Sequence, residues 1–225
     1  MCASERNRRP ADPTGPTPDA PDPGPDPTGA ADPLAALAAR LRALPPSCGP
    51  VRLVAVDGHA GSGKTTFAGA LAESLGGAPV VHLDDLATHE QLFDWTSRLK
   101  AEVLDPLSRG TTARHRVYDW TARRFDGTRE IPPAPVVLVE GVGSGRRALR
   151  PFLAQLIWMD VPAAVARARG EARDGPELAG FWRTWAPAEA AHFAADPSRP
   201  SAEVVAQGTR WKIHDFADHP LGHAR

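Results

Sequence analysis

Residues 51–66 read VRLVAVDGHAGSGKTT, and they constrain the structure more strongly than any other stretch of the chain. The run 51–56 is apolar and rich in β-branched residues, which predicts a short buried strand. The residues from Gly58 to Thr65 match the pattern G-x-x-x-x-G-K-T. A helix is expected over residues 63–75 behind them. Strand, glycine-rich loop and helix therefore follow in the order that a phosphate-binding loop requires.

The chemistry of this loop points to a nucleoside triphosphate. Glycines let the backbone curl until several N–H groups converge, and the helix N-terminus adds partial positive charge. Lys64 supplies a point charge for the β- and γ-phosphates, and the Thr65 hydroxyl suits Mg²⁺. The chain has no Asn-Lys-x-Asp guanine motif, so the expected ligands are ATP and Mg²⁺. Nine residues are expected to form the cradle: Gly58, His59, Ala60, Gly61, Ser62, Gly63, Lys64, Thr65 and Thr66.

Short apolar runs alternate with helical patterns along the rest of the chain. Further strands are expected at 79–83, 136–139, 156–161 and 203–206, and further helices at 33–44, 93–108, 163–174 and 181–195. Strands that are apolar throughout are typical of a parallel sheet. The pattern predicts an α/β fold of the P-loop NTPase class, with a parallel β-sheet covered by helices on both faces.

Composition divides the chain into three segments. Residues 1–32 are rich in Pro and Asp and have no hydrophobe larger than Ala after Cys2, so a disordered tail is expected. Residues 33–213 contain the predicted elements and form the folded domain. Residues 214–225 are expected to be a loose C-terminal tail. The spacing of its histidines, His214, His219 and His223, suits a loose end better than a metal site.

The overall balance of charge excludes several classes of partner. The 225 residues carry 26 Lys and Arg against 27 Asp and Glu, a net charge of −1, so no footprint for nucleic acid or an acidic membrane exists. Two cysteines give no disulfide framework, and no apolar run approaches the ~18 residues of a membrane span. We expect a cytoplasmic protein with a small-molecule partner, no nucleic-acid partner and no membrane partner. The oligomeric state is not indicated.

Acidic residues follow several of the predicted strands, where ligands of parallel sheets bind. Glu140 ends the strand 136–139, as an acid that orients Mg²⁺ or its bound water would. Asp84 is suited to accept a proton from an attacking hydroxyl, although Asp85 has the same spacing and stays an alternative. Asp160 is expected to be structural. Asp57, between the first strand and the loop, is expected to accept hydrogen bonds from loop N–H groups.

Arginines and histidines give weaker signals. Arg169 and Arg173 share one face of a predicted helix and would neutralise a transferring phosphate as part of a lid, or else are solvated. Residues 141–145 form a glycine-rich loop beside the phosphate site, and the arginines after it face either an anionic ligand or solvent: Arg146, Arg147 and Arg150. His115 is expected at the surface, with a contact to the acceptor as the alternative, since it lies close to Tyr118. Trp182 and Trp185 are expected to pack in the core.

Five motifs in a fixed order resemble those of a known family. They are the unit Gly58 to Thr65, His82-Leu83-Asp84-Asp85-Leu86, Val117-Tyr118-Asp119-Trp120, Val139-Glu140-Gly141-Val142 and Arg169-Gly170-Glu171-Ala172-Arg173-Asp174. Over about residues 50–210 the chain resembles the uridine kinase-like branch of P-loop kinases, in an actinobacterial-type version. The resemblance implies that residues 33–213 are a P-loop kinase domain. It also implies that Asp84 is catalytic, Glu140 lies on the magnesium side, Arg169 and Arg173 are lid arginines, and Tyr118 and Asp119 bind the acceptor.

Two departures from the family pattern occur, the first at the acceptor site and the second in the lid. This chain has Ala87 at the position of the tyrosine in the family's Asp-x-Phe-Tyr motif. It has Arg169-Gly170 at the position of the Arg-Arg pair that is usual in the lid. Aromatic residues that would stack on a base remain, namely Tyr118, Trp120 and Phe125. The predicted activity is transfer of the γ-phosphate of ATP to a hydroxyl group, with a nucleoside such as uridine or cytidine as acceptor. The alternatives are a pantothenate- or glycerate-like acid, favoured by positive charge from Arg114, Arg116 or Arg123, and a relative that binds ATP without catalysis.

Overall fold

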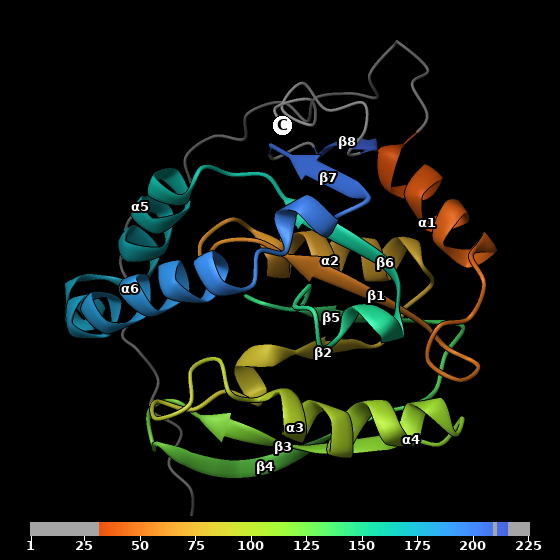
Figure 1. Ribbon diagram of the computed structural model, residues 1–225, viewed down its shortest axis with the longest axis horizontal. Coiled ribbons are helices and arrows are strands. Elements are labelled where there is room, and N and C mark those ends of the chain that lie inside the picture. Colours follow the sequence, from red (N-terminus) through yellow and green to blue (C-terminus); the bar gives the residue numbers. More distant parts are fainter. Residues whose placement is uncertain (1–31, 209–210, 216–225) are drawn as a thin grey trace, which may run out of the picture. The chain divides into compact units, whose positions relative to one another are not determined.

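The computed structural model describes residues 32–208 and 211–215. The predicted tail 1–32 therefore lies outside the described residues, except for Asp32. His219 and His223 lie outside them as well. A six-stranded sheet has the order β2-β5-β1-β6-β7-β8 (Figure 1). The strands are β1 (Arg52–Asp57), β2 (Val80–His82), β5 (Val136–Glu140), β6 (Leu153–Met159), β7 (Val204–Gln207) and β8 (Lys212–Asp215). The first five in this order pair in parallel, and β8 pairs antiparallel with β7. The predicted parallel α/β sheet is confirmed, with one antiparallel edge strand added.

Alternate residues of the central strands belong to two separate apolar clusters. On β1, Leu53 and Ala55 belong to one cluster, whereas Val54 and Val56 belong to the other. The second cluster includes residues of α1 (Pro33–Ala43) and α2 (Lys64–Ser74). The first includes residues of α3 (Thr96–Leu99) and α4 (Asp105–Ser108) and of the hairpin β3 (Ala113–Asp119) and β4 (Arg124–Ile131). Because side chains alternate across a strand, both faces of the sheet are covered.

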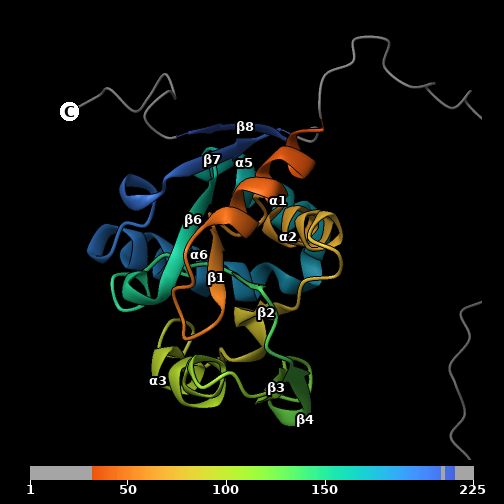
Figure 2. The same ribbon diagram turned by 90° about the vertical axis from the view of Figure 1, so that its right-hand side faces the viewer.

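Helix α1 begins as its sequence predicts. The Asp32 side chain accepts a hydrogen bond from the Leu34 amide at 3.0 Å, and Pro33 occupies the first helical position. Leu34, Leu37 and Leu41 are buried against the sheet. In two perpendicular views, α1 and β8 lie at one side of the sheet, and α3 and the β3–β4 hairpin lie beyond β2 at the other (Figures 1 and 2).

The prediction of a single helix over residues 93–108 is wrong in detail. The segment consists of α3, a π-helical turn over Lys100–Leu104, and α4. Pro106 has no N–H and its ring crowds the carbonyl four residues earlier, so the regular hydrogen-bond ladder is interrupted at this point. The segment still buries Leu99, Val103 and Leu104 as the helical spacing indicated.

The β3–β4 hairpin and strand β8 were not predicted. In β3, Ala113, His115 and Tyr118 are buried, while Arg114 and Arg116 are exposed. The expectation of His115 at the surface is therefore wrong, because strand alternation turns this ring inward. Strand β8 extends two residues past the predicted domain end at 213. Helices α5 (Ala163–Asp174) and α6 (Ala179–Ala195) lie where the sequence placed them. Among the described residues, no helix is long and apolar enough to cross a membrane.

Candidate active site

The glycine-rich loop connects the end of β1 to the start of α2, as the motif requires. Gly61 and Gly63 have φ angles of 83° and 91°, a region that side chains with a Cβ rarely adopt. A Cβ at Gly61 would lie 2.1 Å from the carbonyl oxygen of Ala166 on α5. Glycine is therefore needed here both for the turn and for the close approach of α5.

Lys64 is held inside this loop. Its Nζ donates to the carbonyl oxygens of Gly58 and His59, each at 2.9 Å, and the residue is buried although it lines the main cavity. Two backbone carbonyls thus fix the ammonium group inside the loop, at the wall of the main cavity.

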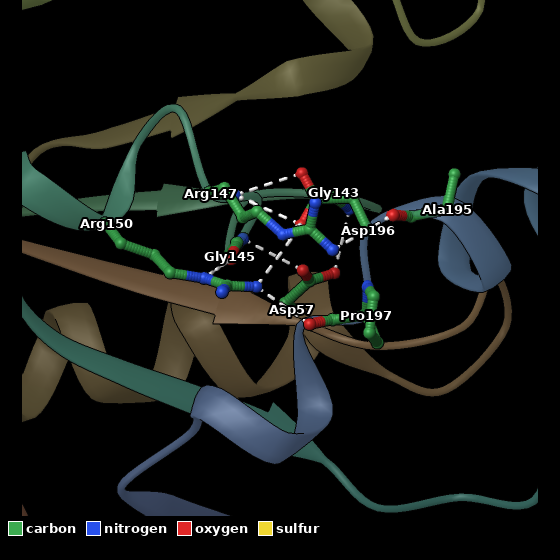
Figure 3. A network of polar contacts seen from close by, with 8 residues as sticks. All are labelled: Asp57, Gly143, Gly145, Arg147, Arg150, Ala195, Asp196 and Pro197. Atoms are coloured by element: carbon green, nitrogen blue, oxygen red, sulfur yellow. Dashed lines mark hydrogen bonds and ion pairs between the residues drawn. The ribbon is translucent and has the colours of Figure 1, made fainter.

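Asp57 ties the phosphate loop to the neighbouring loop after β5. Its Oδ1 accepts from the Gly58 amide at 2.7 Å. Oδ1 also accepts from the Gly143 amide and Oδ2 from the Gly145 amide, each at 2.9 Å (Figure 3). The residue is fully buried. The expectation that Asp57 satisfies loop donors is confirmed, and residues 141–145 do lie beside the phosphate loop.

The three arginines after this loop bind protein groups, and Arg147 is also exposed to solvent, which is one of the two alternatives expected. Arg147 and Arg150 both contact the Asp196 carboxylate, and they donate to the carbonyls of Ala195 and Pro197 (Figure 3). Arg146 is buried, stacks over the Trp95 ring at 4.1 Å and donates to the Phe93 carbonyl. These arginines fasten the C-terminal end of α6 and the start of α3 to the loop.

Two acids and a hydroxyl meet at the ends of β2 and β5. Glu140 is buried, and its Oε1 accepts from the Thr65 hydroxyl at 3.2 Å. Asp84, in a 3₁₀ turn after β2, lines the same cavity as Lys64, Thr65 and Glu140. No cluster of three or more His, Cys, Asp or Glu side chains suited to a metal occurs in the described part of the chain. The carboxylates of Asp84 and Glu140 and the Thr65 hydroxyl are nevertheless oxygen donors, and they fit Mg²⁺. This ion is typically bound by one or two carboxylates together with phosphate oxygens and water.

His82, the first residue of the motif around Asp84, is a neighbour of Glu140 to which the sequence assigned no role. Its Nδ1 lies 2.6 Å from Glu140 Oε1, the oxygen that also accepts from Thr65. This hydrogen bond to Glu140 raises the pKa of His82 above its ordinary value. Together the contacts of His82 and Thr65 fix the orientation of the Glu140 carboxylate.

Asp84 and Asp85 have different environments. The side chain of Asp84 is exposed to the cavity, yet the protein atoms around it displace water and, together with the charge on Glu140, raise its pKa above the ordinary value. Asp85 points toward the hairpin, where its Oδ2 lies 3.4 Å from Arg129 Nε and 3.9 Å from His115 Nε2. Of the two, Asp84 faces the cavity.

The main cavity has a volume of about 520 Å³ and joins the phosphate loop to an aromatic wall. The wall is formed by His89, Trp120, Phe181, Trp182 and Trp185. Phe181 and Trp185 are stacked with centroids 5.5 Å apart, and His89 lies 4.9 Å from the Trp120 ring. A smaller pocket of about 340 Å³ shares His89 and Phe181 with it. The cavity is thus bordered by the phosphate loop, Asp84 and flat rings.

The predicted acceptor residues are placed differently from one another. Tyr118 is buried, and its hydroxyl lies 3.0 Å from His89 Nδ1. Asp119 accepts from the amides of Thr121 and Ala122 at 2.8 and 2.7 Å, as a turn residue does. Arg123 lines the smaller pocket and lies 3.4 Å from Glu90. Of the residues predicted to bind the acceptor, Asp84 lines the main cavity and Tyr118, Asp119 and Arg123 are not among its described lining residues. Of the rings predicted to stack on a base, Trp120 lines it.

The lid arginines are also separated. Arg173 lines the cavity and binds Asp174 at 2.6 Å, and hydrogen bonding to Asp174 raises the pKa of the Arg173 guanidinium. Arg169 is exposed on α5 and is not among the described residues that line the cavity. At Gly170 an added Cβ would lie 2.5 Å from the Trp182 ring, so Trp182 packs where a second lid arginine would stand. Trp182 and Trp185 are buried as predicted, and they also line the cavity.

Two functional candidates had no signal in the sequence. His89 projects into both pockets from a segment without a motif. Glu189 of α6 binds the phosphate loop through the Ala60 amide at 2.7 Å, although 129 positions separate the two residues. A contact between segments so distant leaves no spacing pattern in one sequence.

Comparisons with known proteins bear on the fold and on part of the sequence. No protein-family model matches the chain. Two strains of Chloroflexus aurantiacus each have a uridine kinase 30% identical over 107 residues, covering 40% of this chain and 51% of the relative. The chain therefore spans about half the length of the curated relatives it matches. The structure of a possible uridine kinase from Bacillus stearothermophilus matches with a TM-score of 0.55 at 19% identity, over 76% of this chain and 96% of that one. The expected resemblance to uridine kinase-like P-loop kinases is confirmed in sequence and in fold.

Proposed function

We propose that the protein is an ATP-dependent kinase that transfers the γ-phosphate to a hydroxyl group of a small molecule, with a nucleoside such as uridine or cytidine as the favoured acceptor. The observation that carries the proposal is the single cavity in which Lys64, Asp84 and an aromatic wall meet. Similarity to uridine kinases over part of the chain supports the same activity.

Each group at the phosphate end has a role in this proposal. The loop amides and Lys64 bind the triphosphate, and Thr65 and Glu140 would hold Mg²⁺. When bound, this ion neutralises charge on the phosphate oxygens. Arg173 is placed to stabilise negative charge on the transferring group. Arg169 would join it only if α5 moves, since Arg169 lies outside the cavity wall described above.

Asp84 is the proposed base. Its carboxylate accepts the proton of the acceptor hydroxyl as that oxygen bonds to the γ-phosphorus, and the bond from this phosphorus to the bridging oxygen of ADP breaks. The products are a phosphate monoester and ADP. A raised pKa suits a base, because it strengthens the proton affinity of the carboxylate.

The aromatic wall favours a flat heteroaromatic acceptor. Rings such as Trp120 and Phe181 bind a base by stacking with little demand on its identity. Ala87, which replaces the family tyrosine, is buried in the core and is not among the described residues that line the cavity. His89, two residues later, instead projects its ring into the cavity.

An acidic acceptor is less well supported by the charges. Each of the three arginines that would favour it contacts a glutamate: Arg114 with Glu130 at 2.8 Å, Arg116 with Glu102 at 3.5 Å and Arg123 with Glu90 at 3.4 Å. These ion pairs neutralise the local positive charge that a carboxylate substrate would need.

The test is release of ADP from MgATP by the purified protein with uridine, cytidine, adenosine, pantothenate or glycerate as acceptor. The proposal expects release that depends on a pyrimidine nucleoside and is lost in Asp84→Asn. Release with an acid alone would keep the chemistry and replace the acceptor. Binding of ATP without release for any acceptor would support a relative that binds the nucleotide without catalysis.

A further inference from the structure

A carboxylate from a distant helix contacts the phosphate loop. Glu189 of α6 is only 9% exposed, and its Oε1 accepts from the Ala60 amide at 2.7 Å. Its Oε2 lies 3.3 Å from His59 Nδ1. Burial of a carboxylate is costly unless donors compensate for the lost water, and here both donors come from the phosphate loop.

The Ala60 amide belongs to the same peptide group as the His59 carbonyl. In a planar trans peptide the N–H and C=O bonds point in opposite directions. Since the N–H is directed to Glu189, the carbonyl is directed to the other side, where it accepts from Lys64 Nζ at 2.9 Å. Glu189 thus fixes the peptide orientation that provides one of the two carbonyls holding Lys64.

The surroundings of His59 restrain the same peptide. The imidazole ring packs edge-on against Trp158 and Phe193, with centroid distances of 5.7 and 5.0 Å. Phe193 lies one helical turn after Glu189 on α6, so both residues contact the loop from one helix. The same helix carries Trp182 and Trp185 into the aromatic wall.

We propose that Glu189 is a positioning residue of the nucleotide site. It holds the peptide between His59 and Ala60 so that Lys64 is fixed at the loop centre before the triphosphate arrives. It also joins the helix that forms the acceptor wall to the loop that binds phosphate. This inference rests on the proposed binding of MgATP.

A carboxylate without a positioning role would have the opposite effect on the affinity for MgATP. A negative charge beside a phosphate site repels the triphosphate, so a carboxylate that only occupied the loop would weaken binding. Its removal would then tighten the binding of MgATP. A positioning role predicts weaker binding on removal, because the loop loses its fixed shape.

The experiment compares three variants by calorimetric titration with MgATP. Glu189→Met keeps the side-chain volume but removes the acceptor, and the dissociation constant is expected to rise roughly tenfold or more, as for loss of a hydrogen bond to a charged group. Glu189→Gln retains an oxygen that can accept from the Ala60 amide, so its constant should stay within about threefold of the wild type. Glu73→Met is the matched control, because Glu73 is exposed in the last turn of α2. It should leave the constant unchanged.

A second measurement, by NMR in the absence of nucleotide, reports on the peptide between His59 and Ala60. The Ala60 amide proton should resonate downfield in the wild type and in Glu189→Gln, and move upfield in Glu189→Met. Thermal melting verifies folding, and Glu189→Ala replaces the methionine variant if the thioether does not fit. Unchanged or tighter MgATP binding in the folded Met or Ala variant would overturn the inference alone. No MgATP binding by the wild type would overturn the proposed function together with it.

Discussion

The phosphate end and the acceptor end of the cavity are built in different ways. At the phosphate end the loops are held through their backbone: Asp57 accepts from three loop amides, Lys64 donates to two loop carbonyls, and Glu189 accepts from another amide. Side-chain contacts there centre on Glu140, which Thr65 and His82 contact. At the acceptor end side chains contact side chains, as in the contacts of His89 with Tyr118 and Trp120. Backbone contacts place no demand on neighbouring side-chain identity, whereas side-chain contacts define a shape.

This difference separates chemistry from specificity. The groups that would bind and transfer phosphate lie at the ends of the sheet strands β1, β2 and β5, on α2 directly after the loop and, for Arg173, on α5. The acceptor wall comes from the β3–β4 hairpin, the segment around His89 and α6, which lie outside that sheet. Substitutions at the acceptor end should therefore change which hydroxyl compound is used, and substitutions at the phosphate end should abolish the reaction.

The largest expected effect concerns the paired acids between the two ends. Asp84→Asn should lower turnover by ~10²–10⁴-fold, the usual contribution of a positioned base, with MgATP binding retained. Asp85→Asn should lower it much less, because Asp85 contacts Arg129 and His115 of the hairpin. Steady-state ADP release by the two variants shows which of the two acids is the base. Near-full activity of Asp84→Asn would show that the base is assigned wrongly.

The next effect tests the backbone contacts of the phosphate end. Asp57→Ala leaves three buried amides without their acceptor, each worth about 1–3 kcal/mol, so stability to urea should fall by about 3 kcal/mol or more. Asp126→Ala, in an exposed pair with Arg124, should change stability by about 0.5 kcal/mol or less. Equal stability of the two variants would contradict a structural role for Asp57.

A smaller effect is expected at the acceptor wall. His89→Ala removes a ring that lines both pockets, and KM for the acceptor should rise roughly tenfold while KM for ATP is unchanged. Glu90→Ala, at the exposed neighbouring position, is the matched control. Equal increases in both KM values for His89→Ala would mean that the two ends are not separate.

The smallest effect is a gain in stability. Because the folded-state pKa of Asp84 is raised, folding binds a proton, and stability falls as pH rises through the interval between the unfolded and folded pKa values. Asp84→Asn removes this cost, so it should melt slightly above the wild type at pH 7, and the gap should close as pH approaches the ordinary pKa of Asp. The acid limb of wild-type turnover should likewise lie above that ordinary pKa. A lower melting temperature of Asp84→Asn at pH 7 would contradict the raised pKa.

The two ends also differ in how far the sequence predicts them. Residues 58–65 are consecutive, and Asp84 and Glu140 follow apolar strands whose ends meet at one edge of the sheet, so local pattern and topology suffice to place them. The same reasoning located Asp57 correctly. Glycine at 61 and 63 is required by the backbone itself, which is why this motif is recognisable at all.

The acceptor end was less predictable for physical reasons. In β3 the arginines that alternate with buried residues hide the strand from a search for apolar runs, and His115 was misplaced with it. Pro106 interrupts a helix whose apolar spacing is otherwise regular. His89, Glu189 and the cavity face of Trp185 depend on how α6 packs over the loop, and one sequence holds no pattern for that contact.

The most direct test of phosphate transfer is ³¹P NMR of the reaction of the wild-type protein with MgATP and uridine or cytidine. We predict that the γ-phosphate signal is replaced by that of a nucleoside phosphate monoester in equal amount to ADP, and that Asp84→Asn gives neither product. Inorganic phosphate as the sole product, or monoester formation undiminished in Asp84→Asn, would contradict the account.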